Sequence, residues 1–217
     1  ADLSKETRTH VEGIFSYQKT RTQLRVAIEE IQNYTYFGTS YVTTVDKDNN
    51  YGRAELTAGV YQESGNINLL TAQLRQDFRF GIFNWENVIT YQNSSKQDVL
   101  PVPALNIFTN LYLKFKIAKV LSVELGGDMT FFTKYYAPDY VPQLAQLAIQ
   151  KNEDSRVELG GYPFIDVYAN FHLKRARFFV MMSHVNNASG NKMMFLAPHY
   201  PVNGNVLRFG VSWNFYN

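Results

Sequence analysis

The chain has 217 residues, a formal net charge of +2 and no cysteine. This composition excludes a disulfide framework and thiolate metal sites, and it disfavours a strongly basic nucleic-acid binder. No apolar run approaches the roughly 18 residues that a membrane-spanning helix needs. Aromatic residues make up 15% of the sequence, which is high for a soluble domain and suits aromatic girdles at two membrane interfaces.

In chain order, apolar and polar residues alternate in one segment after another. The first clear case sets Leu24, Val26 and Ile28 against polar neighbours such as Arg25. Strict alternation predicts strands with one apolar and one polar face. Several segments alternate for ten or more residues, close to the roughly 9–11 that a tilted membrane-spanning strand needs. After a first strand before Gln18, the predicted strands are RTQLRVAI, LLTAQLRQDFRF, FNWENVITY, LNIFTNLYLKFKI, LSVELGGDMTFFTKY, IDVYANFHL, the less regular RFFVMMSH, and NVLRFGVSWNFYN.

The connections between these strands alternate in length. Short turns are predicted near Gln18–Arg21, Gly81–Ile82, Ala118–Val120 and Arg175–Ala176, and long polar connections at about Gly38–Asn66, Asn93–Pro103, Ala137–Gly160 and Asn186–Gly204. Short turns on one side and long loops on the other are typical of an outer-membrane barrel. A soluble sandwich with Greek-key crossings has no reason to keep that rhythm. The sequence therefore predicts an all-β, antiparallel, up-and-down transmembrane barrel across residues 1–217, with about 9–10 strands.

Two features depart from this scheme. Glu30 falls on the apolar parity, so the strand either bulges there or has already left the hydrocarbon. The segment Tyr51–Gln62 alternates weakly and is either a further strand or part of a loop hairpin; counted as loop, it leaves nine strands. Bacterial single-chain barrels have an even number of strands, whereas nine is an odd number. In addition, no secretory signal begins at Ala1. We therefore expect the chain to be the C-terminal portion of a longer protein and of a larger barrel.

Three stretches carry a family resemblance: YYAPDYVPQLAQLAIQ, VELGGYPFIDVYANFHLKRARFFVMMSHVN and FLAPHYPVNGNVLRFGVSWNFYN. They resemble the C-terminal region of the Bacteroidetes "putative porin" family. The resemblance implies an outer-membrane barrel of a Gram-negative bacterium, in contact with outer-membrane lipid, and names no substrate. It also implies an aromatic insertion signal in the last strand, for which Trp213, Phe215 and Tyr216 are the candidates, read by the barrel-assembly machinery. Asn217 stands last, where an aromatic residue is usual.

The polar parity of the predicted strands carries charges of both signs. Its pore-lining candidates are Arg25, Arg75, Asp77, Arg79, Lys114, Lys116, Glu124, Asp128, Asp166, His172 and Arg208, with Glu29, Glu86, Lys134, Lys174 and Arg177 on the same parity. One interpretation is a polar pore wall with a mild preference for anions, since charged rings set selectivity. The alternative is that the charges pair across strands and fill a closed lumen.

Two loop segments carry further hypotheses. In the loop at 137–160, Leu144, Leu147 and Ala148 recur at helical spacing, so a short helix is predicted there, on the rim or folded inward. DKDNN places Asp46, Asp48 and Asn50 at alternate positions, as in a calcium loop. The glycine and the glutamate that such a loop requires are replaced by Tyr51 and Thr57, so a polar turn is favoured and no metal is expected.

No enzymatic site emerges from the histidines, and no cofactor is expected. Ser183 and His184 are consecutive and so point to opposite sides of a strand, and His172 has no serine placed for activation. His10 and His199 are scattered elsewhere. We therefore expect a passive channel for small hydrophilic solutes. The alternative is a non-conducting structural subunit of an outer-membrane complex or homo-oligomer.

Overall fold

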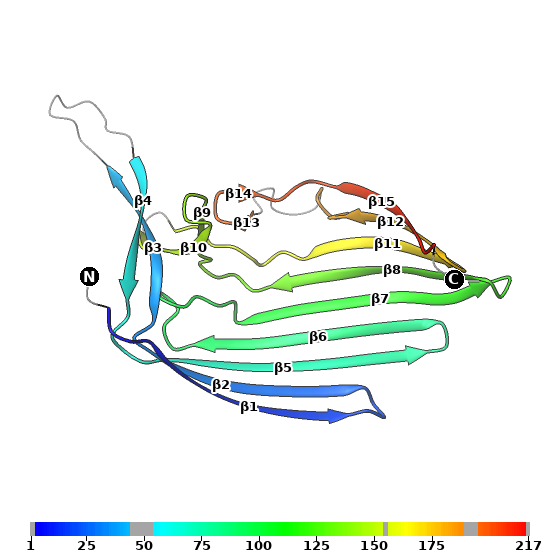
Figure 1. Ribbon diagram of the computed structural model, residues 1–217, viewed down its shortest axis with the longest axis horizontal. Coiled ribbons are helices and arrows are strands. Elements are labelled where there is room, and N and C mark those ends of the chain that lie inside the picture. Colours follow the sequence, from blue (N-terminus) through cyan, green and yellow to red (C-terminus); the bar gives the residue numbers. More distant parts are fainter. Residues whose placement is uncertain (1–2, 44–53, 154–155, 189–194, 216–217) are drawn as a thin grey trace.

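A computed structural model describes residues 3–43, 54–153, 156–188 and 195–215 (Figure 1). Its main feature is one nine-stranded sheet in which every neighbouring pair is antiparallel. In spatial order the strands are β1 (Thr7–Tyr17), β2 (Thr22–Gln32), β5 (Ile67–Phe80), β6 (Phe83–Ser94), β7 (Leu105–Ile117), β8 (Leu121–Phe132), β11 (Phe164–Leu173), β12 (Ala176–Ser183) and β15 (Val206–Trp213). The predicted up-and-down order of nine strands is confirmed.

The connections follow the predicted rhythm, with all short turns at one end of the sheet and all long connections at the other (Figure 1). Residues 18–21, 81–82, 118–120 and 174–175 form the short turns. The last of these lies one residue before its predicted position. Gly81 has φ +60° and Lys174 has φ +51°, so each two-residue turn contains a left-handed residue. Such turns match the twist of the strands that they connect.

Three of the long connections contain strands of their own. Strands β3 (Thr35–Thr43) and β4 (Ala54–Gln62) form a hairpin, so the weakly alternating segment belongs to a loop hairpin and not to the main sheet. Strands β9 (Asp139–Val141) and β10 (Gln146–Gln150) form a second hairpin, and β10 pairs with β3 in parallel. The result is a four-stranded sheet in the order β4-β3-β10-β9. In the last long connection β13 (Phe195–Ala197) pairs with β14 (Tyr200–Pro201).

The predicted helix in the loop at 137–160 is wrong. Leu144 lies in the turn between β9 and β10, and Leu147 and Ala148 lie in β10. Ala145 has φ +50°, which lies outside the range of a right-handed helix. Residues 146–150 pair with β9 and β3, and Leu144 and Ala145 form only local turn bonds, so helical spacing did not decide the structure of this segment.

The main sheet is a single layer. Its register places Leu24, Leu74 and Ile89 opposite one another on one face, and this apolar face continues through every strand to β15. Leu207, Phe209 and Val211 on this face are 63%, 78% and 66% exposed. Within the described residues no second sheet covers them, so the sandwich interpretation is excluded.

A small apolar cluster joins the main sheet to the four-stranded sheet. Ile31 and Ile67 of the main sheet pack there with Tyr36, Val99 and Ile149. This cluster holds the long-loop end together. Across the described residues, no helix is both long enough and apolar enough to cross a membrane.

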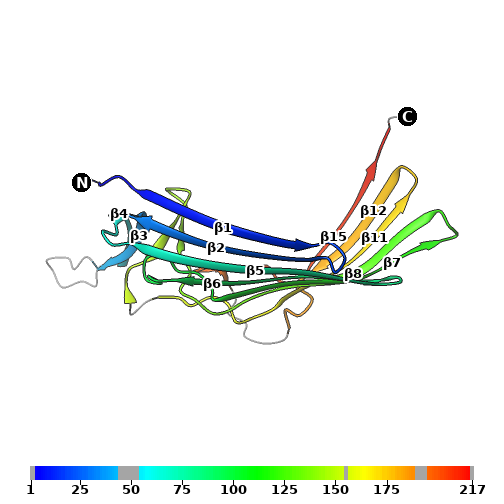
Figure 2. The ribbon, with the colours of Figure 1, turned by 90° about the horizontal axis from the view of Figure 1, so that it is seen from below.

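The main sheet is curved and twisted (Figure 2). Its order begins at β1 and ends at β15, and these two strands do not pair with each other. The described chain is therefore an open segment of barrel wall. Glu30 lies in unbroken register with Thr9 and Asn68, so a bulge at that position is excluded. The prediction that Glu30 lies beyond the hydrocarbon remains.

Candidate functional site

The polar face of the main sheet is organised in rows that cross the strands. The register aligns Asp77, Glu86, Asn110, Asp128 and Asp166 on five consecutive strands, and we call this set the acidic row. Nearer the short turns, the register aligns Lys116, Ser122, His172, Arg177 and Ser212, and we call this set the basic row. The two rows exist because directly paired residues of antiparallel strands share one face.

All eleven pore-lining candidates lie on this polar face. Arg25 stands at the β1 edge, whereas Asp77, Asp128 and Asp166 belong to the acidic row and Lys116 and His172 to the basic row. Two further rows lie between the acidic row and the basic row. One contains Arg79 and Arg208, and the other contains Lys114 and Glu124. Arg75 of β5 pairs with Gln23 of β2. The structure thus brings the candidates onto one surface, where the acidic row and the basic row differ in sign but Lys114 and Glu124 share a row. Their role as a pore wall remains a prediction.

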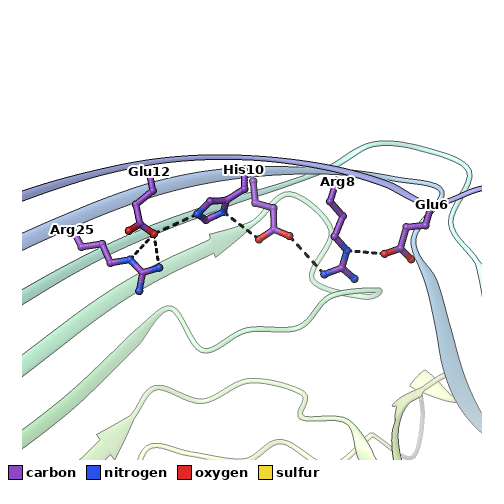
Figure 3. A network of polar contacts seen from close by, with 6 residues as sticks. Glu6, Arg8, His10, Glu12 and Arg25 are labelled. Carbon is purple, nitrogen blue, oxygen red and sulfur yellow. Dashed lines mark hydrogen bonds and ion pairs between the residues drawn. The ribbon is translucent and has the colours of Figure 1, made fainter.

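Near the β1 edge, the charges on the polar face form a chain of ion pairs (Figure 3). Arg8 Nε donates to Glu6 Oε1 at 2.7 Å, and Arg25 Nε donates to Glu12 Oε2 at 2.8 Å. His10 lies between them, with Nε2 3.3 Å from Glu12 Oε2 and Nδ1 3.8 Å from Glu29 Oε2. The side chains point to the same side of the strands (Figure 3). Acids and bases therefore alternate along this edge.

The remaining charges divide into paired and unpaired groups. Lys114 Nζ contacts Glu124 directly, and Arg75 Nε lies 3.6 Å from Asp77 Oδ1. Arg79, Lys116, Arg177 and Arg208 form no salt bridge with any residue that the structure describes. Glu86, Asp128 and Asp166 of the acidic row also form no salt bridge with a described residue. Four unpaired basic side chains and three unpaired acidic side chains thus give the polar face a small excess of unpaired positive charge.

Two tyrosines of the polar face were not among the predicted site residues. Tyr112 Oη donates to Glu86 Oε1 at 3.0 Å, and Tyr168 Oη donates to Asn110 Oδ1 at 2.9 Å. Both rings flank Gly126, which lies between them in the register. They hold two members of the acidic row in place. The signal was available, because Tyr112 shares the parity of Lys114 and Tyr168 that of Asp166.

Several polar side chains on the apolar face bond to one another. Trp85 Nε1 donates to Thr109 Oγ1 at 2.7 Å, and Thr109 Oγ1 donates to Asn87 Oδ1 at 2.8 Å. At the neighbouring strands, Thr22 Oγ1 donates to Gln76 Oε1 at 2.5 Å. Polar groups facing hydrocarbon must find partners within the protein. The side chains of these five residues meet that requirement.

Comparison with known proteins agrees with this geometry. The sequence profile of the family described as "Putative porin" matches residues 1–217. The chain belongs to this family.

The family assignment confirms the porin part of the resemblance over the whole chain, and no comparison tests the bacterial group. Among solved structures, the fold is similar to that of the siderophore receptor PirA from Acinetobacter baumannii, with a TM-score of 0.60 and 15% identity. The match covers 99% of this chain and 32% of the receptor chain. This porin-family chain therefore has the fold of one segment of an outer-membrane receptor barrel. No curated protein matches it significantly in sequence.

His184 of this porin-family chain has a structural position. His184 is 5% exposed; its Nδ1 lies 3.0 Å from Asn203 O, and its Nε2 lies 3.1 Å from Tyr162 Oη. Its side chain is thus engaged away from Ser183. In the described parts of the chain, no group of three or more histidine or acidic residues is arranged to hold a metal ion. Asp46, Asp48 and Asn50 lie outside the described residues.

Two of the three insertion-signal candidates lie at the end of the last strand. Trp213 pairs with Ala176 and is 57% exposed, and Phe215 is 84% exposed. Tyr216 lies outside the described residues. The exposed aromatic side chains lie next to the short turns, and their role in insertion remains a prediction.

Proposed function

We propose that this chain forms part of the wall of an outer-membrane channel through which small hydrophilic solutes diffuse passively. The observation that carries the proposal is the two-sided main sheet, whose apolar face is uncovered while its polar face bears ordered rows of charge. Long strands with such faces suit a wall between lipid and water. Family membership and the likeness to a receptor barrel support a location in the outer membrane of a Gram-negative bacterium.

The mechanism follows from the charges that remain unpaired. Solutes would be selected by the width of the lumen and by the field of its wall, without a chemical step. On the polar face, the four basic side chains that form no salt bridge with a described residue outnumber the three such acidic side chains, so the wall would favour anions mildly. Siderophore recognition by PirA is not transferred to this chain, because 15% identity supports the fold alone.

Single-channel recording tests this proposal. The intact protein, reconstituted in a planar bilayer, is expected to conduct ions and to give a reversal potential of weak anion preference in a KCl gradient. Lys116→Gln on the polar face should reduce that preference. Lys19→Gln, in the short turn after β1, removes the same charge outside the strands and should leave it unchanged. Insertion without conductance would contradict the channel.

A non-conducting structural subunit is the second candidate. It is favoured by the paired charges of Glu12 with Arg25 and of Lys114 with Glu124, which resemble the filling of a closed lumen. The four-stranded sheet beyond the strand ends would then offer a surface to partner subunits or to a second copy. Stoichiometric co-purification with other outer-membrane proteins, together with absent conductance, would favour this candidate over the channel.

A further inference from the structure

A hollow of about 510 Å³ lies on the polar face near the short turns. It spans the basic row and the row beside it, from β7 to β15. Its walls include Ser122, His172, Arg177 and Ser212 of the basic row, with Lys114 and Glu124 at one side. The hollow therefore collects positive charge, hydroxyl groups and one imidazole from neighbouring strands of the main sheet.

The net charge of the hollow comes from Arg177. Lys114 and Glu124 neutralise each other by direct contact. The Arg177 side chain is exposed and forms neither a hydrogen bond nor a salt bridge with any described residue. Its register partners are His172 on one side and Ser212 on the other. A planar guanidinium between donor groups suits the two oxygens of a carboxylate or phosphate.

The same hollow has an apolar wall. Phe179 interrupts the polar parity of β12 and is 44% exposed. Its partner in the register is Gly210, and a Cβ atom added at Gly210 would collide with the Phe179 ring. The ring therefore lies over the glycine backbone. It presents a flat apolar surface one row away from the Arg177 guanidinium.

These two features together specify a ligand class. We propose that the hollow is a binding site for a small organic anion, in which a carboxylate or phosphate meets Arg177 while a flat apolar body packs on Phe179. Ser122, His172 and Ser212 supply further hydrogen bonds to the anionic oxygens. The site rests on the proposed channel, since it names a class of solute that would pause on the polar wall during passage.

Ligand-observed NMR of the intact protein in detergent micelles tests the site with benzoate, phenyl phosphate, acetate and the neutral benzyl alcohol. Benzoate and phenyl phosphate should bind measurably, benzyl alcohol should bind at least about tenfold more weakly, and acetate several-fold more weakly. Equal binding of benzoate and benzyl alcohol would overturn the proposal. So would the absence of any benzoate binding.

Variants separate this site from the general field of the wall. Arg177→Gln should weaken benzoate binding at least about tenfold. Arg208→Gln removes the same charge from the same face outside the hollow and should change binding less than about twofold. Equal loss in both variants would indicate diffuse attraction and overturn the site. If Arg177→Gln does not fold, Arg177→Lys keeps the charge without the two-pronged geometry and should still weaken binding several-fold.

The aromatic wall has its own test. Phe179→Leu keeps an apolar side chain over Gly210 and should reduce the preference for benzoate over acetate by about two- to tenfold. An unchanged preference would overturn the role of Phe179. Because binding is measured in micelles, a protein that binds benzoate but never conducts refutes only the channel. A protein that conducts but does not bind benzoate refutes only the site.

Discussion

Gly126 is fixed by its neighbours on the polar face. A Cβ atom added there would lie 2.6 Å from Tyr112 Cβ and 2.8 Å from Tyr168 Oη. We therefore expect Gly126→Ala to destabilise the sheet by about 1–3 kcal/mol, because strands β7 and β11 have to move apart to accept it. Gly13→Ala in β1 is the matched control, since nothing lies within 4 Å of its added Cβ.

Urea unfolding of the intact protein in lipid vesicles measures both glycine variants. The Gly126 variant should unfold at a lower urea concentration, and the Gly13 variant should stay close to the wild type. Equal urea midpoints for the two variants would mean that Tyr112 and Tyr168 move aside without loss of stability. That result would contradict the tight fit around Gly126.

Glu63, in the long connection before β5, makes the local stability of the folded state depend on pH. Lys96 Nζ donates to Glu63 Oε1 at 2.7 Å and Gly65 N donates to it at 3.1 Å. The Lys96 hydrogen bond, with help from Gly65, lowers the pKa of Glu63 below 4.5. A carboxyl whose pKa is lower in the folded state stabilises that state above pH 4.5. This contribution is lost as the pH falls through the lowered value.

Hydrogen exchange checks this pH dependence. Protection of the amides at 63–65 and 95–100 should fall as the pH drops below about 4.5, and Glu63→Gln should remove most of that change. Glu158→Gln is the control, because its nearest cation, Lys134 Nζ, lies 3.6 Å away. The same loss of pH dependence in the control would refute the assignment to Glu63.

At the scale of elements, the β9–β10 hairpin depends on one buried side chain. Gln150 Nε2 donates to Ala137 O at 2.6 Å and to Val157 O at 3.0 Å, and Val157 N donates to Gln150 Oε1 at 2.7 Å. Gln150→Leu leaves these buried groups without partners. It should weaken the attachment of β10 to β3, so amide protection across both strands should fall.

Gln146→Leu is the control for this element, because Gln146 begins the same strand and is exposed. Its amide protection should match the wild type. The hairpin also explains why the predicted helix failed. Ile149 of β10 pairs with Gly38 of β3, and no local spacing of Leu144, Leu147 and Ala148 reports a partner so far away in the sequence.

At the scale of the whole molecule, the medium around each face of the main sheet determines how much a charged substitution on that face destabilises the protein. Ile89 on the apolar face and Phe108 on the polar face are both 39% exposed and lie on adjacent strands at nearly the same depth. If lipid covers the apolar face, Ile89→Arg should destabilise the inserted protein by about 2–4 kcal/mol. Phe108→Arg, which would meet water, should cost much less.

Reversible unfolding from lipid vesicles compares the two arginine variants. Similar losses for both would mean that the two faces have similar surroundings. In that event the wall between lipid and water would have to be abandoned, whichever solute was tested.

The sequence alone determined the nine strands of the main sheet, their two faces and the alternation of short and long connections. Alternation has a period of two, so each residue reports its own face without knowledge of any partner. The pattern from Leu105 to Ile117 was therefore sufficient to place Lys114 and Lys116 together on the polar side. The family resemblance predicted a member of the porin family, and the sequence profile confirmed that prediction.

Only the tertiary structure decided which residues of different strands stand side by side. The acidic row joins Asp77 to Asp166 through pairings set by register, and register depends on turns and long loops that a strand's own pattern does not encode. The same holds for the contact of Phe179 with Gly210 and for the parallel pairing of β10 with β3. Local periodicity fixes the direction of a side chain, whereas its neighbours arise from pairings between distant segments.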